Sequence, residues 1–203
     1  MIVLHEFTAN QLIRKSRESK KFSRYENRVK VNKISVLRVG LLDIKEGSKD
    51  LNLYFMVNSA TNPSVKYRVD FRLVDFVDHL REYAYTLDTN VTIKRLIRDI
   101  RPFFNQEIKG ADIMINCSCP DFTYRFRDSA RNEKFYFGID SSDEARSPNS
   151  NKINPKYEGS VCKHIMKIIS RPSLWYERVL RSLSNLLKNH NSVLVKKLDI
   201  PYG

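Results

Sequence analysis

The clearest pattern in the chain is an alternation of apolar and polar side chains between residues 51 and 73. The apolar positions are Leu51, Leu53, Phe55 and Val57 in a first run and Val65, Tyr67, Val69, Phe71 and Leu73 in a second. Residues two apart on a strand point to the same face, so each run has one apolar face. The segment 58–64 between them has the Ser, Asn and Pro content of a turn. The pattern predicts an antiparallel hairpin with one buried face.

Further elements are predicted on both sides of this hairpin. Residues 29–44 are expected to supply a third strand, and residues 112–117 another one after the hairpin. Between hairpin and last strand the apolar spacing becomes helical. It predicts one helix over residues 76–84 and a second over residues 91–100, which Pro102 is expected to end. The fold class is therefore α+β, an antiparallel sheet flanked by helices.

The segment that follows residue 117 is rich in aromatic side chains. Residues 122–127 alternate between aromatic and polar positions, which predicts a strand, and residues 134–138 are expected to return beside it. Residues 140–159 are rich in Ser, Asn, Asp and Pro and are expected to form a loop. These predictions describe an insertion with no net charge, since residues 120–161 carry seven basic and seven acidic side chains.

Helical spacing returns near the C-terminus. Residues 162–169 predict a short helix that is interrupted near Pro172, and the helical pattern resumes from Trp175 to Leu187. We expect Trp175, the only tryptophan, to anchor this second helix in the core. The tail around residues 193–195 is expected to add a strand or to dock on a neighbouring molecule.

All three cysteines of the chain lie in two short pieces. Cys117 and Cys119 follow the predicted strand at 112–117, and Cys162 stands with His164 where the helix of 162–169 begins. Three thiolates and one imidazole are the ligand set of a closed tetrahedral zinc site. Alternatives are ordinary buried cysteines with an exposed histidine, or a strained Cys117–Cys119 disulfide. The pattern favours one structural Zn²⁺.

The order Cys-x-Cys, a long gap, then Cys-x-His resembles the SWIM-type zinc finger. Phe122 fits the aromatic residue expected after the first pair, whereas the 42 residues between Cys119 and Cys162 exceed the usual gap. The resemblance implies zinc and a binding role toward DNA or protein, without catalysis. The amino-acid sequence around both ligand pairs also resembles that of small SWIM-bearing proteins of tailed bacteriophages, which are encoded among genes for virion components.

The chain is accordingly divided into four segments. Residues 1–25 are expected to form a basic N-terminal helical arm, and residues 26–110 the antiparallel sheet with its helices. Residues 111–190 are expected to form the SWIM-like zinc module in the C-terminal half, with a long inserted loop and a C-terminal helix. Residues 191–203 form the tail.

The net charge of +13 is concentrated at the two ends of the chain. Residues 1–34 carry nine basic and three acidic side chains, and residues 165–203 carry seven and two. Thr8 and Gln11 predict a capping box for a helix that reaches about residue 22. Candidate contacts to nucleic acid or to an acidic protein partner are Arg14, Lys15, Arg17, Lys20, Lys21, Arg125, Arg127, Arg178 and Arg181. A merely solvated basic face is the alternative.

Several classes of protein are disfavoured. No run of eighteen apolar residues spans a membrane, and residues 1–6 do not begin a secretion signal. No glycine loop for nucleotides and no cluster of catalytic carboxylates occurs, so we expect neither enzyme activity nor a small-molecule substrate. Reduced cysteines fit synthesis in the cytoplasm, with incorporation into a virion as a later step.

These observations predict a non-catalytic, zinc-stabilised structural or adaptor protein. It would belong to a larger oligomeric assembly and be held there by protein partners. The expected assembly is a bacteriophage virion, with this protein in the head, neck or portal region. The basic ends would face an acidic protein or packaged DNA. The alternative is a free DNA-binding accessory or regulatory protein that uses the SWIM zinc finger.

Overall fold

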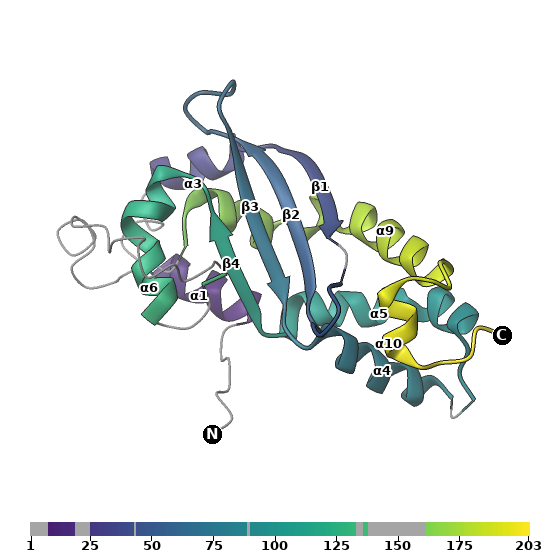
Figure 1. The fold of residues 1–203 in the computed structure, drawn as a ribbon. Helices are drawn as coiled ribbons and strands as arrows, with labels where there is room; N and C mark the ends of the chain where they lie inside the picture. Colours follow the sequence, from purple (N-terminus) through teal and green to yellow (C-terminus); the bar gives the residue numbers. More distant parts are fainter. Residues whose placement is uncertain (1–7, 19–24, 43, 89, 133–135, 138–160) are drawn as a thin grey trace.

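A four-stranded antiparallel sheet organises the molecule (Figure 1). The computed structural model describes residues 8–18, 25–42, 44–88, 90–132, 136–137 and 161–203. The strands follow the chain in the order β1 (Val36–Leu42), β2 (Leu51–Asn58), β3 (Lys66–Leu73) and β4 (Ile113–Cys117). The predicted α+β class is thereby confirmed.

The hairpin predicted from alternation is the centre of this sheet. Leu53 pairs with Phe71 and Phe55 pairs with Val69, and all four side chains are buried. The other face of each strand is partly or fully exposed, apart from the buried amides at the two ends of β2. The turn closes through a hydrogen bond from the Ser59 N–H to the carbonyl oxygen of Val65, 2.8 Å long. The alternating pattern fixes the register, because a one-residue shift would expose the apolar face.

The helices lie on one face of the sheet, and no described helix lies across the opposite face (Figure 1). Their bounds are α1 Ala9–Glu18, α3 Tyr25–Asn32, α4 Phe76–Leu87, α5 Ile93–Gly110, η1 Phe122–Phe126, α6 Arg127–Asn132, α8 Lys163–Ser170, η2 Pro172–Leu174, α9 Tyr176–Lys188 and α10 Val193–Leu198. Helix α9 packs against β1 and α5, and α8 packs against α1 and α3. Buried side chains from the sheet and from these helices form one hydrophobic core.

Helix α1 belongs to this core. Its capping box is present as predicted, with Thr8 N–H donating to Gln11 Oε1 and Gln11 N–H donating to Thr8 Oγ1. Leu12 and Ser16 are fully buried against the rest of the chain, and α1 contacts α5 and α8. The helix is thus packed onto the chain along one face. The part of the predicted helix beyond residue 18 lies outside the described residues.

The prediction for the first strand of the sheet needs correction. The strand expected over 29–44 is β1 at its C-terminal half only, because residues up to Asn32 belong to α3. Only Val29 and Val31 alternate with polar residues in this segment, which is too short a pattern to specify a strand. Val31 is buried in the helix, which packs on α8.

Pro102 does not end its helix, as the sequence had indicated, but lies inside α5. A proline within a helix removes one backbone donor and displaces the preceding turn. Here tyrosines of neighbouring helices donate to carbonyls near the break: Tyr83 Oη to Asp99 O and Tyr176 Oη to Arg101 O, both at 2.9 Å. Helix α5 continues through the proline to Gly110.

The aromatic segment after Cys119 is helical, which contradicts the predicted strand. Residues 122–126 form a π-helical turn that α6 continues. Phe122 and Phe126, four residues apart, are buried, whereas Tyr124 is half exposed. Of the predicted return strand, Tyr136 makes an isolated parallel bridge to Ile115. Residues 133–135 and 138–160 lie outside the described residues, and with them most of the predicted return strand and loop.

The C-terminal helices follow the prediction except in the tail. The break at Pro172 separates α8 from α9, and α9 ends before Asn189. The tail, expected as a strand or as a docking segment, forms the short helix α10. Ser192 caps it through a hydrogen bond from the N–H of Val195, and α10 packs on α4 and α9 of the same chain.

A part-buried pair of titratable side chains between α4 and α5 predicts a pH dependence of stability. His79 Nδ1 lies 2.7 Å from Oε1 of Glu107, whose side chain is buried. Burial lowers the pKa of His79, but the hydrogen bond and charge of Glu107 outweigh it, and the net pKa is raised above 6.5. Burial raises the pKa of Glu107 above 4.5, against the opposing effect of His79. The folded state therefore binds protons more tightly at both groups.

Stability from this pair should be present at low pH and be lost as pH rises. The contribution of Glu107 is lost as pH rises from 4.5 through its raised pKa, and that of His79 is lost as pH rises from 6.5 through its own raised pKa. Chemical denaturation from pH 5 to pH 8 should show wild type losing about 1 kcal/mol more than His79→Gln, a modest value because His79 is part-exposed. His190→Gln is the control. Any effect of pH on metal binding is common to wild type and His79→Gln, so it cancels when their profiles are subtracted. Identical pH profiles for wild type and His79→Gln would contradict the assignment.

Candidate metal centre

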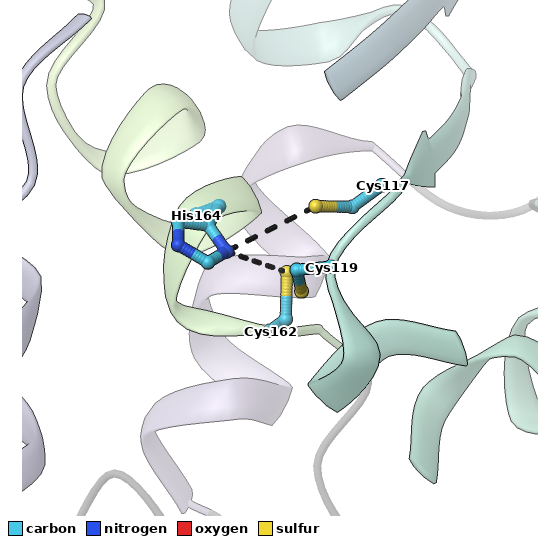
Figure 2. Close-up of side chains that lie close together, drawn as sticks. All are labelled: Cys117, Cys119, Cys162 and His164. Carbon is cyan, nitrogen blue, oxygen red and sulfur yellow. Dashed lines mark hydrogen bonds between the residues drawn. The ribbon is translucent and has the colours of Figure 1, made fainter. Parts of the chain in front are cut away.

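The two ligand pairs predicted from sequence meet beside the sheet. Cys117 is the last residue of β4, and Cys119 stands two residues later at the start of a helical turn. Cys162 is the N-cap of α8, and His164 lies in its first turn. Figure 2 shows the four side chains converging from these segments. All four are buried and all three cysteines are free thiols, so the alternative of a Cys117–Cys119 disulfide does not hold.

The geometry is close to that of a four-ligand metal site. Nδ1 of His164 lies 3.9 Å from Sγ of Cys117 and 4.0 Å from Sγ of Cys162. All four ligand atoms lie within 4.8 Å of one another. A tetrahedral zinc ion would set these separations at about 3.8 Å between sulfurs and about 3.6 Å between sulfur and nitrogen. Contraction by about 1 Å or less would therefore complete the coordination of an ion.

The local backbone explains how Cys119 is aimed. Pro120 begins the helical turn, a position where the missing N–H of proline costs nothing. The N–H of Phe122 then donates to Sγ of Cys119 over 3.3 Å. A sulfur that accepts a backbone hydrogen bond is stabilised as thiolate. The segment thus orients the ligand and favours its charged form.

The electrostatics of the cluster call for a cation. Burial raises the pKa of the Cys117 thiol well above its ordinary value and also raises that of Cys162. Hydrogen bonds from the Cys117 and Cys162 thiols, with help from the Phe122 N–H, lower the pKa of Cys119 to about 4. Burial thus disfavours the thiolate form at Cys117 and Cys162. A divalent ion would stabilise all three as thiolates, because it offsets their mutual repulsion.

The histidine is held by packing against the sheet. Its ring lies against Tyr67 of β3, with centroids 4.8 Å apart, and only 4% of His164 is exposed. Nδ1 faces the sulfurs, while the buried Nε2 has no hydrogen-bond partner among the described residues. Sequence reasoning missed two contacts of the cluster, the packing of Tyr67 on His164 and the hydrogen bond from the Phe122 N–H to Cys119. Both depend on the pairing of β3 with β4 and on the turn at Pro120, which sequence alone left open.

The chemistry of this donor set is that of a closed site. Four protein ligands fill a tetrahedral ion, so no coordination position remains for water or substrate. Such a site joins the end of β4 to the start of α8, which are 45 residues apart in the sequence at Cys117 and Cys162. The cluster could hold one metal ion, and this arrangement is compatible with a zinc finger.

The predicted contact residues are spread over several elements. Arg14 and Arg17 are exposed on α1, Arg178 and Arg181 on α9, and Lys15 is half-buried. Lys20 and Lys21 lie outside the described residues. Arg125 of η1, exposed, has its Nε 3.6 Å from Asp121 Oδ1, and Arg127 begins α6.

These residues do not form one patch. Arg125 and Arg127 lie on elements beside β4, whereas α9 packs on β1, the strand at the opposite edge of the sheet. Figure 1 shows α1 and α6 toward one side of the molecule and most of α9 toward the other. The structure therefore brings the metal ligands together and leaves the basic residues dispersed.

No protein-family model, curated protein or solved structure matches the chain. None of the described helices combines the length and the apolar composition that crossing a membrane requires.

Proposed function

We propose that the cluster of Cys117, Cys119, Cys162 and His164 binds one structural Zn²⁺ in a SWIM-type zinc finger. The single observation that carries this proposal is the convergence of every cysteine in the chain, with one histidine, in one buried site. Thiolate and imidazole ligands in tetrahedral arrangement favour zinc among the abundant divalent ions. The ion would fasten α8 to the sheet and so fix the packing of the C-terminal helices.

We further propose that the protein is a non-catalytic adaptor of a larger assembly, a bacteriophage virion component by its resemblance. Support for the non-catalytic role comes from the closed ligand set, which leaves the ion no open position. Support for a binding role comes from the net charge of +13 and from the exposed arginines of α1 and α9. The rigid, zinc-fastened core would present these basic surfaces to an acidic protein partner or to packaged DNA.

The alternative is a free DNA-binding accessory or regulatory protein. The observation that favours it is the exposure of Arg14 and Arg17 on one helix, since exposed arginines can contact phosphates. Dispersal of the remaining basic residues over both edges of the sheet argues for the adaptor, because a dedicated duplex binder concentrates its cations on one surface.

Duplex affinity separates the two roles. For an adaptor we expect the purified, metal-loaded protein to bind a 20-base-pair duplex no tighter than about 10⁻⁴–10⁻⁶ M at physiological salt, the range of non-specific binding. The quadruple variant Arg14→Gln, Arg17→Gln, Lys20→Gln, Lys21→Gln should then behave as does a control with Lys66, Lys109, Lys188 and Lys196 changed to glutamine. Fluorescence anisotropy across a salt series measures both.

Tight duplex binding with a steep salt dependence, flattened by the quadruple variant but not by the lysine control, would establish the DNA-binding alternative instead. The log–log slope should become less negative by about 0.9 for each lost phosphate contact, which would count the contacts made by those four side chains. Zinc content and the circular dichroism melt must be unchanged in both variants.

A further inference from the structure

The face of the sheet that is turned away from the helices carries a regular array of side chains, here called the outer face. Strand register places its residues in three rows across the strands (Figure 1). The rows are Arg38–Met56–Arg68, Gly40–Tyr54–Asp70–Asn116 and Leu42–Asn52–Arg72–Met114. Antiparallel sheets often leave one face to solvent, but that face is then usually a plain mixture of polar side chains. This one combines arginines with an aromatic ring and a hollow.

Tyr54 lies at the centre of the array. A Cβ added to Gly40 would come within 2.6 Å of three atoms of the tyrosine, so the ring lies directly over this glycine. The guanidinium carbons of Arg38 and Arg68 stand 5.9 Å and 5.4 Å from the ring centroid. The absence of a side chain at Gly40 thus lets an aromatic ring settle on β1 between two cations. This arrangement can stack a planar group and contact phosphates at the same place.

A hollow of about 610 Å³ continues the outer face toward β4. Its lining includes Lys45, Asn52, Arg68, Arg72, Asn116 and Phe137. The guanidinium of Arg72 lies over the ring of Phe137, 4.2 Å from the centroid. The hollow therefore offers a second cation on an aromatic ring, together with amide groups that can form hydrogen bonds to the edges of bases.

The charge of this surface is positive although carboxylates are present. Arg68 donates from Nε to Asp70 over 2.7 Å, and Arg72 contacts Asp50 at 3.3 Å. Half of the Arg68 side chain is nevertheless exposed, and Arg38 and Lys45 are exposed as well. The carboxylates orient two of the four cations. A polyanion is thus the complementary partner.

We propose that the outer face binds single-stranded nucleic acid, with a base on Tyr54 and phosphates on Arg38 and Arg68. Unpaired bases can stack on an aromatic ring, whereas a duplex keeps its bases stacked on one another. An acidic peptide would use the arginines, but it presents a planar group to the tyrosine only where it carries an aromatic residue, whereas every nucleotide carries a base. This proposal uses neither the zinc ion nor the basic residues on α1 and α9, so it holds whichever role proposed above is correct.

The test uses the metal-loaded protein and a fluorescein-labelled 20-mer of deoxythymidine. Tyr54→Leu, which still covers Gly40 with an apolar side chain, should weaken binding by about 5- to 150-fold, the effect of losing one stacked base. Tyr54→Phe keeps the ring and should bind as does wild type. Arg38→Gln with Arg68→Gln should reduce the log–log salt slope by about 1.4, for two lost phosphate contacts.

Matched controls make the outcomes decisive. Lys109→Gln with Lys188→Gln removes the same charge from exposed positions of α5 and α9 and should leave the affinity for the 20-mer unchanged. Equal losses in the arginine pair and in this lysine pair would overturn the proposal in favour of non-specific attraction, and so would full binding by Tyr54→Leu. Absence of binding to the 20-mer, with binding of polyglutamate that depends on Arg68 alone, would assign the outer face to an acidic protein.

Discussion

Replacing Cys162 with serine is expected to release the bound metal and to lower the free energy of unfolding by about 3–5 kcal/mol, the cost of breaking a buried set of charges. Serine is a poor zinc ligand, so only three of the four ligands would remain and the ion would be released. In zinc-finger peptides the ion contributes about 10–16 kcal/mol, as much as the whole stability of a domain. The loss is smaller here because the ligand-bearing segments also pack into a large core.

The measurement pairs metal content with stability. Inductively coupled plasma mass spectrometry should find one zinc per wild-type chain and none in Cys162→Ser, and urea denaturation gives the change in free energy. Lys163→Gln is the matched control, since it changes the residue between two ligands without touching the cluster. Chelation of wild type should reproduce the effect of the cysteine substitution. Full zinc content in Cys162→Ser, or another metal in wild type, would contradict the zinc proposal.

The strands were predictable where one pattern had one structural reading. Alternation over 51–73 specifies a half-buried strand pair, because a register shift of one residue exposes phenylalanine and leucine side chains to water. The candidate ligand cluster was predictable for a related reason: thiols are few, and metal binding uses them at characteristic spacings. How far Cys117 lies from Cys162 in space was not encoded in these local patterns. It depends on the pairing of β3 with β4 and on the docking of α8.

The failed predictions share a physical cause, which is that tertiary contacts decided between two acceptable local structures. Phe122, Tyr124 and Phe126 would share one face of a strand, whereas Phe122 and Phe126 alone share one face of a helix. Phe122 and Phe126 are buried and Tyr124 is half exposed, which selects the helix. The pair Cys119-Pro120 was the overlooked signal, since proline favours the first position of a helix. Pro102 lies within α5, where tyrosines from two other helices donate to the carbonyls of Asp99 and Arg101, and no local pattern shows these tertiary contacts.

Substitution of Trp175 by alanine is expected to lower the free energy of unfolding by about 3–5 kcal/mol. Its side chain is 1% exposed and meets Phe55 of β2 edge to face, with centroids 5.1 Å apart. Its Nε1–H donates to the carbonyl oxygen of Ile168 over 3.0 Å. Alanine would leave a cavity between α9 and the sheet and an unpaired carbonyl at the end of α8. Both losses act on the same junction.

Zinc content should nevertheless remain at one per chain in Trp175→Ala, because the ligands Cys162 and His164 stand at the other end of α8 from Ile168. Trp175→Phe, which keeps an aromatic ring but loses the hydrogen bond of Nε1–H, should lower the free energy of unfolding by about 1–2 kcal/mol. Denaturation followed by far-ultraviolet circular dichroism avoids reliance on the lost tryptophan fluorescence. A change below about 1 kcal/mol for the alanine variant would show that α9 is not anchored through this residue. Loss of zinc with the tryptophan would instead show that the metal centre and the α8–α9 junction unfold as one unit, so that the ion stabilises the whole C-terminal layer of helices.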